Sequence, residues 1–125
     1  MLQSIQGTQT ENNLLQAFMG ESKARNLYQE FAKVAQKEGF VRIAIWFEEV
    51  AQHELSHAKN FSKFFENSTV SIQSTVSIPK IGSTIENLET AIRGELFEAN
   101  ILYPQFAAVA KNEGFTKIAA KFKSI

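Results

Sequence analysis

Five side chains that can bind a metal lie in phase with the apolar faces of three predicted helices. Glu54 and His57 form a Glu-x-x-His motif, which places both on one helix face about one turn apart. Glu21, and then Glu95 with Glu98, fall on the apolar stripes of two other helical segments. An ionised carboxylate in an apolar interior costs several kcal/mol unless something pairs with it. No lysine or arginine lies on these stripes at the matching level, so the pattern predicts a bound cation.

The ligand types narrow the choice of metal. Carboxylates mixed with imidazole suit iron or manganese better than calcium, which rarely uses histidine. One glutamate from each of two helices, with Glu-x-x-His from each of the other two, is the pattern of di-iron carboxylate bundles. Taken singly, each of these residues is more often a surface or structural feature. Their agreement across three helices favours a metal site.

Two tyrosines are predicted to support the site. Tyr28 and Tyr103 lie one or two turns from Glu21 and Glu95, so we expect hydrogen bonds from the phenols to ligand carboxylates. Tyrosines at such positions are otherwise core or rim aromatics. His53 is out of phase with the apolar stripe and is expected in solvent.

End signals and periodicity predict the helices that hold these residues. Thr8 with Glu11 fits a capping box, and Gly39 is a natural stop, so one helix spans about residues 9–37 and another about residues 41–65. The side chains expected in the core include Leu14, Phe18, Phe31 and Ala35 of the first helix, Phe40, Ile43, Trp46, Phe47, Val50 and Phe61 of the second, and Leu88, Ile92, Leu102 and Phe106 of a third.

The second half of the chain begins with an irregular connection. Residues 67–82 are rich in serine, threonine and valine and have no helical period, which indicates an extended crossover. Ser83 with Glu86 repeats the capping box and starts a third helix that runs to about residue 112. Gly114 ends it, and a fourth helix begins near Phe115 and reaches the last residue after about three turns.

The chain is internally repeated. Residues 27–35 are echoed by residues 102–110 at an offset of 75 positions. The sequence therefore predicts a single domain over residues 1–125, built from two helical hairpins over about residues 9–66 and 83–125.

The second copy contains one residue more than the first. Glu21 precedes Tyr28 by seven positions, whereas its counterpart Glu95 precedes Tyr103 by eight. A single inserted residue in a continuous helix is most easily absorbed as a π-bulge. Pro104, which lacks a backbone N–H, follows where the helical ladder is already disturbed. A π-bulge is therefore predicted just before Pro104.

Composition argues against several classes of protein. Thirteen basic residues balance thirteen acidic ones, so no net charge favours nucleic acid or an anionic membrane. No segment approaches the roughly 20 apolar residues of a membrane span. Met1 to Gly7 is polar and does not resemble a signal peptide, so we expect a cytoplasmic protein.

The chain resembles the rubrerythrin family along essentially its whole length. The matching motifs are Gly7-Thr8, Gly20-Glu21-Ser22-x-Ala24-Arg25-Asn26-x-Tyr28, Glu38-Gly39-Phe40, Glu54-x-x-His57-Ala58-Lys59, Gly94-Glu95-x-x-Glu98 and Leu102-Tyr103-Pro104. The resemblance implies an all-α, ferritin-like four-helix bundle with a long crossover between its second and third helices. It also implies a non-haem di-iron peroxidase that reduces hydrogen peroxide in oxidative-stress defence. Glu21, Glu54, His57, Glu95 and Glu98 would be iron ligands, with manganese or zinc as substitutes.

Two departures from the family pattern shape the functional prediction. The chain has no cysteine for a rubredoxin-type iron centre, so a separate donor such as a rubredoxin-like protein would supply electrons. The 75-residue offset also places the counterpart of Glu54 at position 129, beyond Ile125. We therefore expect a truncated fourth helix, no second Glu-x-x-His within these residues and a compromised site.

Three functional hypotheses remain open. The first is a rubrerythrin-type peroxidase domain. The second is an iron-binding helical protein without peroxidase activity, in which two hairpins from different chains pair and supply a full ligand set; it predicts a homo-oligomer with exchanged helices. The third is a structural bundle that binds no metal.

Overall fold

The computed structural model describes residues 3–125, so Met1 and Leu2 of the polar N-terminal segment lie outside it. Within this range the chain is all-helical, without a strand, and none of its helices is long and apolar enough to cross a membrane. The elements are α1 (Gln9–Lys37), α2 (Val41–Ser62), α3 (Thr84–Phe97), the π-helix η1 (Glu98–Leu102), α4 (Tyr103–Asn112) and α5 (Thr116–Lys123).

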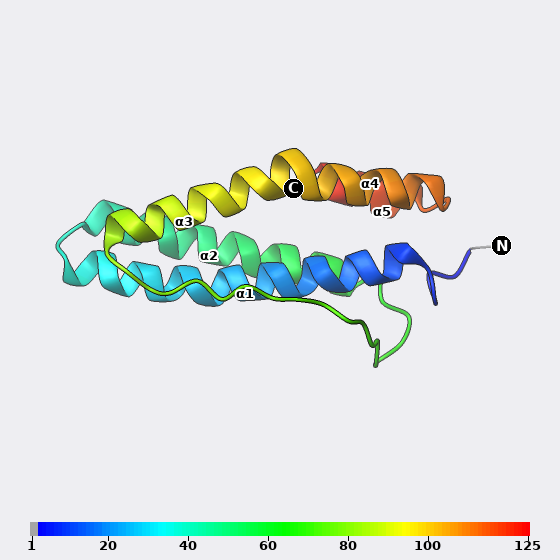
Figure 1. The fold of residues 1–125 in the computed structure, drawn as a ribbon, viewed down its shortest axis with the longest axis horizontal. Coiled ribbons are helices and arrows are strands. Elements are labelled where there is room, and N and C mark those ends of the chain that lie inside the picture. Colours follow the sequence, from blue (N-terminus) through cyan, green and yellow to red (C-terminus); the bar gives the residue numbers. More distant parts are fainter. Residues whose placement is uncertain (1–2) are drawn as a thin grey trace.

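The helices form a long bundle with two hairpins (Figure 1). α1 and α2 run antiparallel to each other. α3, η1 and α4 form one continuous rod above them, and α5 folds back beside α4. The crossover runs along α1 to return the chain to the start of α3. This arrangement confirms the predicted four-helix bundle with its long crossover.

The helix ends follow the predicted signals with small differences. The Thr8 hydroxyl accepts from the Glu11 N–H, but the Glu11 carboxylate accepts from the Gly7 N–H at 3.1 Å, so the reciprocal half of the expected capping box is displaced by one residue. The box of Ser83 and Glu86 is complete. α2 ends at Ser62 rather than near residue 65, because the next residues form a tighter turn.

The two hairpins turn in the same way and hold each other at their ends. Gly39 and Gly114 end α1 and α4 with φ of 88° and 91°, a backbone conformation that favours glycine. At one end the Glu38 carboxylate accepts from the Thr84 N–H at 2.8 Å. At the other, the Glu113 carboxylate accepts from the Thr10 N–H, also at 2.8 Å. Each hairpin turn is therefore tied to the start of the other hairpin.

The predicted π-bulge is present as η1. The backbone N–H of Tyr103 bonds to the carbonyl of Glu98, five residues earlier. Each α-helical residue turns about 100°, so eight regular residues would rotate Tyr103 well away from the face of Glu95. The wide turn absorbs the additional residue, and both side chains face the bundle interior as their counterparts on α1 do.

The apolar core is split into two clusters. One gathers around Phe61, Phe106 and Phe122, and the other around Phe31 and Phe47. Along α1 and α2, the buried glutamates lie between these clusters. The middle of the bundle is thus a polar layer closed by aromatic side chains at both ends.

Three side chains expected in the core are exposed. Phe40 precedes the first residue of α2 at the end of the bundle, and Trp46 lies on the outer side of α2 beside the buried Phe47. Ile92 lies on a face of α3 that no described helix covers. These predictions were wrong because the position of a residue on the apolar stripe of its helix does not show whether another helix packs against that side.

Candidate metal centre

Glu21, Glu54 and His57 converge in the polar layer. One ligand atom from each lies within 4.8 Å of the others, although Glu21 comes from α1 and the other two come from α2. Glu21 is 0% exposed and Glu54 is 3% exposed, whereas the His57 ring reaches partly to solvent. The three-residue spacing of Glu54 and His57 puts both on the α2 face that meets α1.

Each of these side chains has a buried polar atom that lacks a hydrogen-bond partner among residues 3–125. The atoms are Glu21 Oε2, Glu54 Oε2 and His57 Nδ1. His57 Nδ1 lies 3.5 Å from Glu54 Oε2 and 3.7 Å from Glu21 Oε1. These separations exceed the roughly 2.7–3.2 Å of an N–H···O hydrogen bond. Three converging side chains, each with a buried polar atom that has no hydrogen-bond partner, fit a metal ion, which would neutralise both carboxylates.

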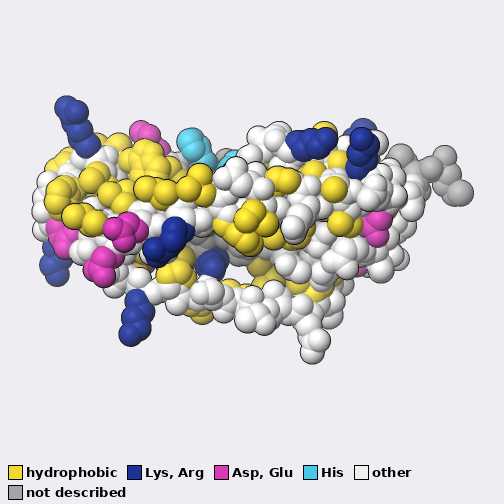
Figure 2. Space-filling model, turned by 45° about the horizontal axis from the view of Figure 1, so that its top comes forward, with side chains coloured by type: hydrophobic (Ala, Val, Ile, Leu, Met, Phe, Trp, Pro, Cys, Tyr) yellow, Lys and Arg dark blue, Asp and Glu magenta, His cyan; other side chains and the backbone are white. Residues whose placement is uncertain are grey.

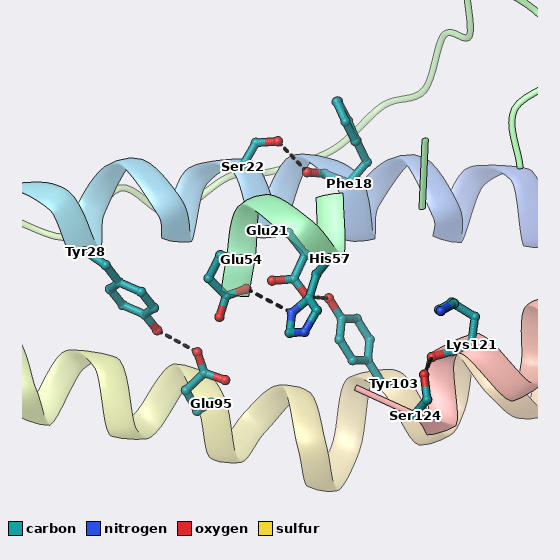
Figure 3. Close-up of polar contacts among 10 residues, drawn as sticks. All are labelled: Phe18, Glu21, Ser22, Tyr28, Glu54, His57, Glu95, Tyr103, Lys121 and Ser124. Atoms are coloured by element: carbon teal, nitrogen blue, oxygen red, sulfur yellow. Dashed lines mark hydrogen bonds and ion pairs between the residues drawn. The ribbon is translucent and has the colours of Figure 1, made fainter. Parts of the chain in front are cut away.

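Tyr28 and Tyr103 cross between the hairpins to hold carboxylates (Figure 3). Tyr103 Oη donates to Glu21 Oε1 at 2.6 Å, and Tyr28 Oη donates to Glu95 Oε1 at 2.8 Å. Burial strongly raises the pKa of both phenols, and nearby carboxylates raise it further. Both tyrosines therefore remain protonated donors. The Tyr103 bond engages Glu21 Oε1 and leaves Oε2 of the same carboxylate without a hydrogen-bond partner.

Glu95 and Glu98 are not part of the tight three-residue group, but they interact with it electrostatically. Burial raises the pKa of Glu95 to about 7, and the neighbouring Glu54 carboxyl raises it too. Burial raises the pKa of Glu98 to about 8, with a further contribution from the charge of Glu95. Without a cation these crowded carboxyls favour their neutral forms. Their role as ligands stays a prediction.

The sequence reasoning missed a cavity on the crossover side of the bundle. It lies between α1, the α3–η1 segment and residues 74–79, and both Tyr28 and Glu98 line it. The Lys23 Nζ donates to the Ser77 carbonyl at 2.7 Å and ties the crossover to α1. The available signal was the repeated glycine before each helix glutamate, at Gly20 and Gly94.

Comparisons with known proteins agree with this geometry. The family model for rubrerythrin matches residues 12–125. The chain is 49% identical over 125 residues to the rubrerythrin of Porphyromonas gingivalis, covering 100% of this chain and 62% of that protein. It is 42% identical over 124 residues to the rubrerythrin of Nitratidesulfovibrio vulgaris, covering 99% of this chain and 65% of that one. The chain therefore spans less than two thirds of the length of these relatives.

Solved structures give the same fold. A mixed-valence form of nigerythrin superposes with a TM-score of 0.79 at 32% identity, covering 98% of this chain and 58% of that chain. A fully reduced, all-ferrous form of nigerythrin also gives a TM-score of 0.79, covering 98% of this chain and 59% of that chain. The bundle is thus ferritin-like, and the chain belongs to the rubrerythrin family.

Proposed function

We propose that this chain is the di-iron domain of a non-haem peroxidase that reduces hydrogen peroxide in cytoplasmic oxidative-stress defence. The observation that carries the proposal is the convergence of Glu21, Glu54 and His57, each of which has a buried polar atom without a hydrogen-bond partner. Family membership supports iron as the metal. Since the same ligand types also accept manganese or zinc, the identity of the metal is part of the test.

Some residues of the chain would bind the metal, and others would orient the metal ligands. Glu21, Glu54 and His57 would hold iron, with Glu95 and Glu98 as further ligands. Bound iron would supply the electrons that reduce peroxide, and two electrons with two protons convert one hydrogen peroxide into two waters. The hydroxyls of Tyr103 and Tyr28 donate hydrogen bonds to Glu21 Oε1 and Glu95 Oε1, and these bonds fix the orientation of both carboxylates. The two aromatic clusters close the polar layer at its two ends.

The electrons would come from a separate donor. Because none of the 125 residues is a cysteine, these residues cannot themselves bind a cysteine-ligated iron centre. We propose a rubredoxin-like electron-transfer protein as the donor.

The test is peroxide consumption by the iron-loaded chain with an added reductant. The parent chain is expected to consume peroxide with turnover, and Glu54→Gln is expected to reduce the rate at least tenfold. Glu49→Gln is the matched control, because Glu49 is an exposed glutamate on the same helix. Equal rates for the parent, both variants and free iron would contradict a peroxidase.

A second candidate function is iron binding that depends on assembly, without peroxidase activity. All three convergent ligands come from the α1–α2 hairpin, so two such hairpins from two chains would supply four glutamates and two histidines. An exposed apolar surface on α3 could also be covered in such an assembly. Figure 2 shows hydrophobic side chains gathered over the half of the molecule that holds α3, where Ile92, Leu96 and Phe97 are exposed. Metal analysis across size-exclusion fractions separates the two functions. Two irons per dimer that are lost on dissociation favour assembly, and iron retained by monomers favours a site within each chain.

A further inference from the structure

A cavity of about 490 Å³ opens beside the candidate metal centre. Its walls are α1 on one side, α3 and η1 on the other, and the crossover at residues 74–79. Figure 2 shows the hollow between the crossover, at the lower edge, and the helices. The bond from Lys23 to Ser77 holds the crossover in place as the outer wall.

The walls of the cavity are mostly apolar. Its apolar lining residues include Met19, Leu27 and Phe97, and its polar ones include Tyr28, Glu98 and the Lys23 that is tied to the crossover. Small-molecule pockets usually measure roughly 300–1,000 Å³, whereas a water occupies about 30 Å³ of liquid volume. The space is therefore far larger than hydrogen peroxide needs, and its walls suit an uncharged organic group.

Two helix glycines keep this cavity open. Gly20 and Gly94 are repeat counterparts on facing helices, and both line the space. Glycine inside a helix costs about 1 kcal/mol relative to alanine. Neither residue has a positive φ, and no atom lies within 4 Å of a Cβ added at either position. Neither backbone conformation nor close packing therefore requires glycine, and a side chain at either position would enter open space.

We propose that this cavity binds the organic group of an alkyl hydroperoxide, with the hydroperoxide end at Tyr28 and Glu98. The apolar walls would bury the alkyl or aryl group, and the Glu98 carboxyl would hydrogen-bond to the hydroperoxide group. The inference deepens the proposed function, on which its redox step rests. In that step the O–O bond breaks, and two electrons from the separate donor with two protons give one alcohol and one water.

Binding is tested on the full, metal-free chain with 2-phenyl-2-propanol, the redox-inert alcohol that matches cumene hydroperoxide. Amide resonances of Gly20, Gly94 and Ser77 are expected to shift saturably in ¹H–¹⁵N spectra. Gly94→Leu fills the cavity and is expected to weaken binding at least tenfold, whereas the control Gly94→Ala stays within threefold of the parent. Gly20→Leu with Gly20→Ala repeats the comparison from the opposite wall if Gly94→Leu does not fold. Shifts that do not saturate, or leucine variants that bind as the parent does, would overturn the proposal.

Turnover by the iron-loaded chain tests the substrate class separately. Gly94→Leu is expected to lower kcat/KM for cumene hydroperoxide at least tenfold while leaving that for hydrogen peroxide within threefold. Equal losses for both peroxides would contradict selective binding of the organic group. If the parent reduces neither peroxide, the proposed peroxidase function fails, and the alcohol titration still decides whether the cavity binds this class of molecule.

Discussion

Replacing Glu98 with glutamine should stabilise the metal-free protein at neutral pH. Burial, and then the charge of Glu95, raises the pKa of Glu98 from its ordinary 4.5 to about 8. The folded chain therefore binds this proton more tightly than the unfolded chain does. The resulting stability is fully present below about pH 4.5 and is lost as pH rises towards 8.

The size of the effect follows from the pKa difference. One pKa unit corresponds to about 1.4 kcal/mol, so keeping a proton at pH 7 that the unfolded chain has lost costs up to about 3 kcal/mol. Partial solvent access reduces this to about 1–3 kcal/mol. Glutamine has the shape of the protonated carboxyl and avoids the cost, so Glu98→Gln should raise the free energy of unfolding by that amount.

Urea denaturation of metal-free parent and variant at pH 4.5, 7 and 8.5 measures this difference. The gain from Glu98→Gln should be small at pH 4.5 and should grow with pH. Glu89→Gln, which changes an exposed glutamate of α3 in the same continuous rod, should have little effect at any pH. A gain that is independent of pH, or a variant less stable than the parent at pH 7, would refute the burial argument.

The remaining predictions concern Tyr103, the glutamate contacts that join the two hairpins at their ends, and the turn at Gly39. Tyr103→Phe removes a buried hydrogen bond to Glu21 and should cost about 1–3 kcal/mol of stability and weaken metal binding, as measured by denaturation and metal titration. Hydrogen bonds from Thr84 lower the pKa of Glu38, and those from Thr10 outweigh burial and lower that of Glu113. The stability that these two contacts contribute is present above about pH 4.5 and is lost on acidification. In a Glu38→Gln, Glu113→Gln double variant, the midpoint of thermal unfolding should therefore fall less on acidification than it does in the parent. Gly39→Ala forces a side chain onto a φ of 88° and should lower the free energy of unfolding by about 1 kcal/mol, measured as a lower midpoint of thermal unfolding.

Local signals in the sequence predicted most of the helical framework. The end of α1 at Lys37 follows from Gly39, and the start of α3 follows from the Ser83 capping box. The position of η1 followed from one extra residue in an otherwise matching repeat. In each case the determining contacts lie within a few residues of the signal, so the sequence alone carries them.

Features that depend on distant neighbours were harder to predict. Trp46 and Ile92 lie near apolar stripes, but their exposure depends on which other helix covers each face. The sequence brought Glu21, Glu54 and His57 to one level and predicted phenol-to-carboxylate hydrogen bonds, but it did not indicate that Tyr103 binds Glu21 of the other hairpin. The cavity also escaped prediction, because its outer wall is an irregular crossover without helical period.

The most direct test is anaerobic titration of the metal-free chain with ferrous iron, followed by calorimetry. We predict saturable binding by the parent, a loss of affinity of at least tenfold in Glu21→Gln and in Glu54→Gln, and unchanged affinity in Glu49→Gln. Binding that survives both substitutions, or a parent chain that binds no more iron than either variant, would contradict a metal centre built by α1 and α2.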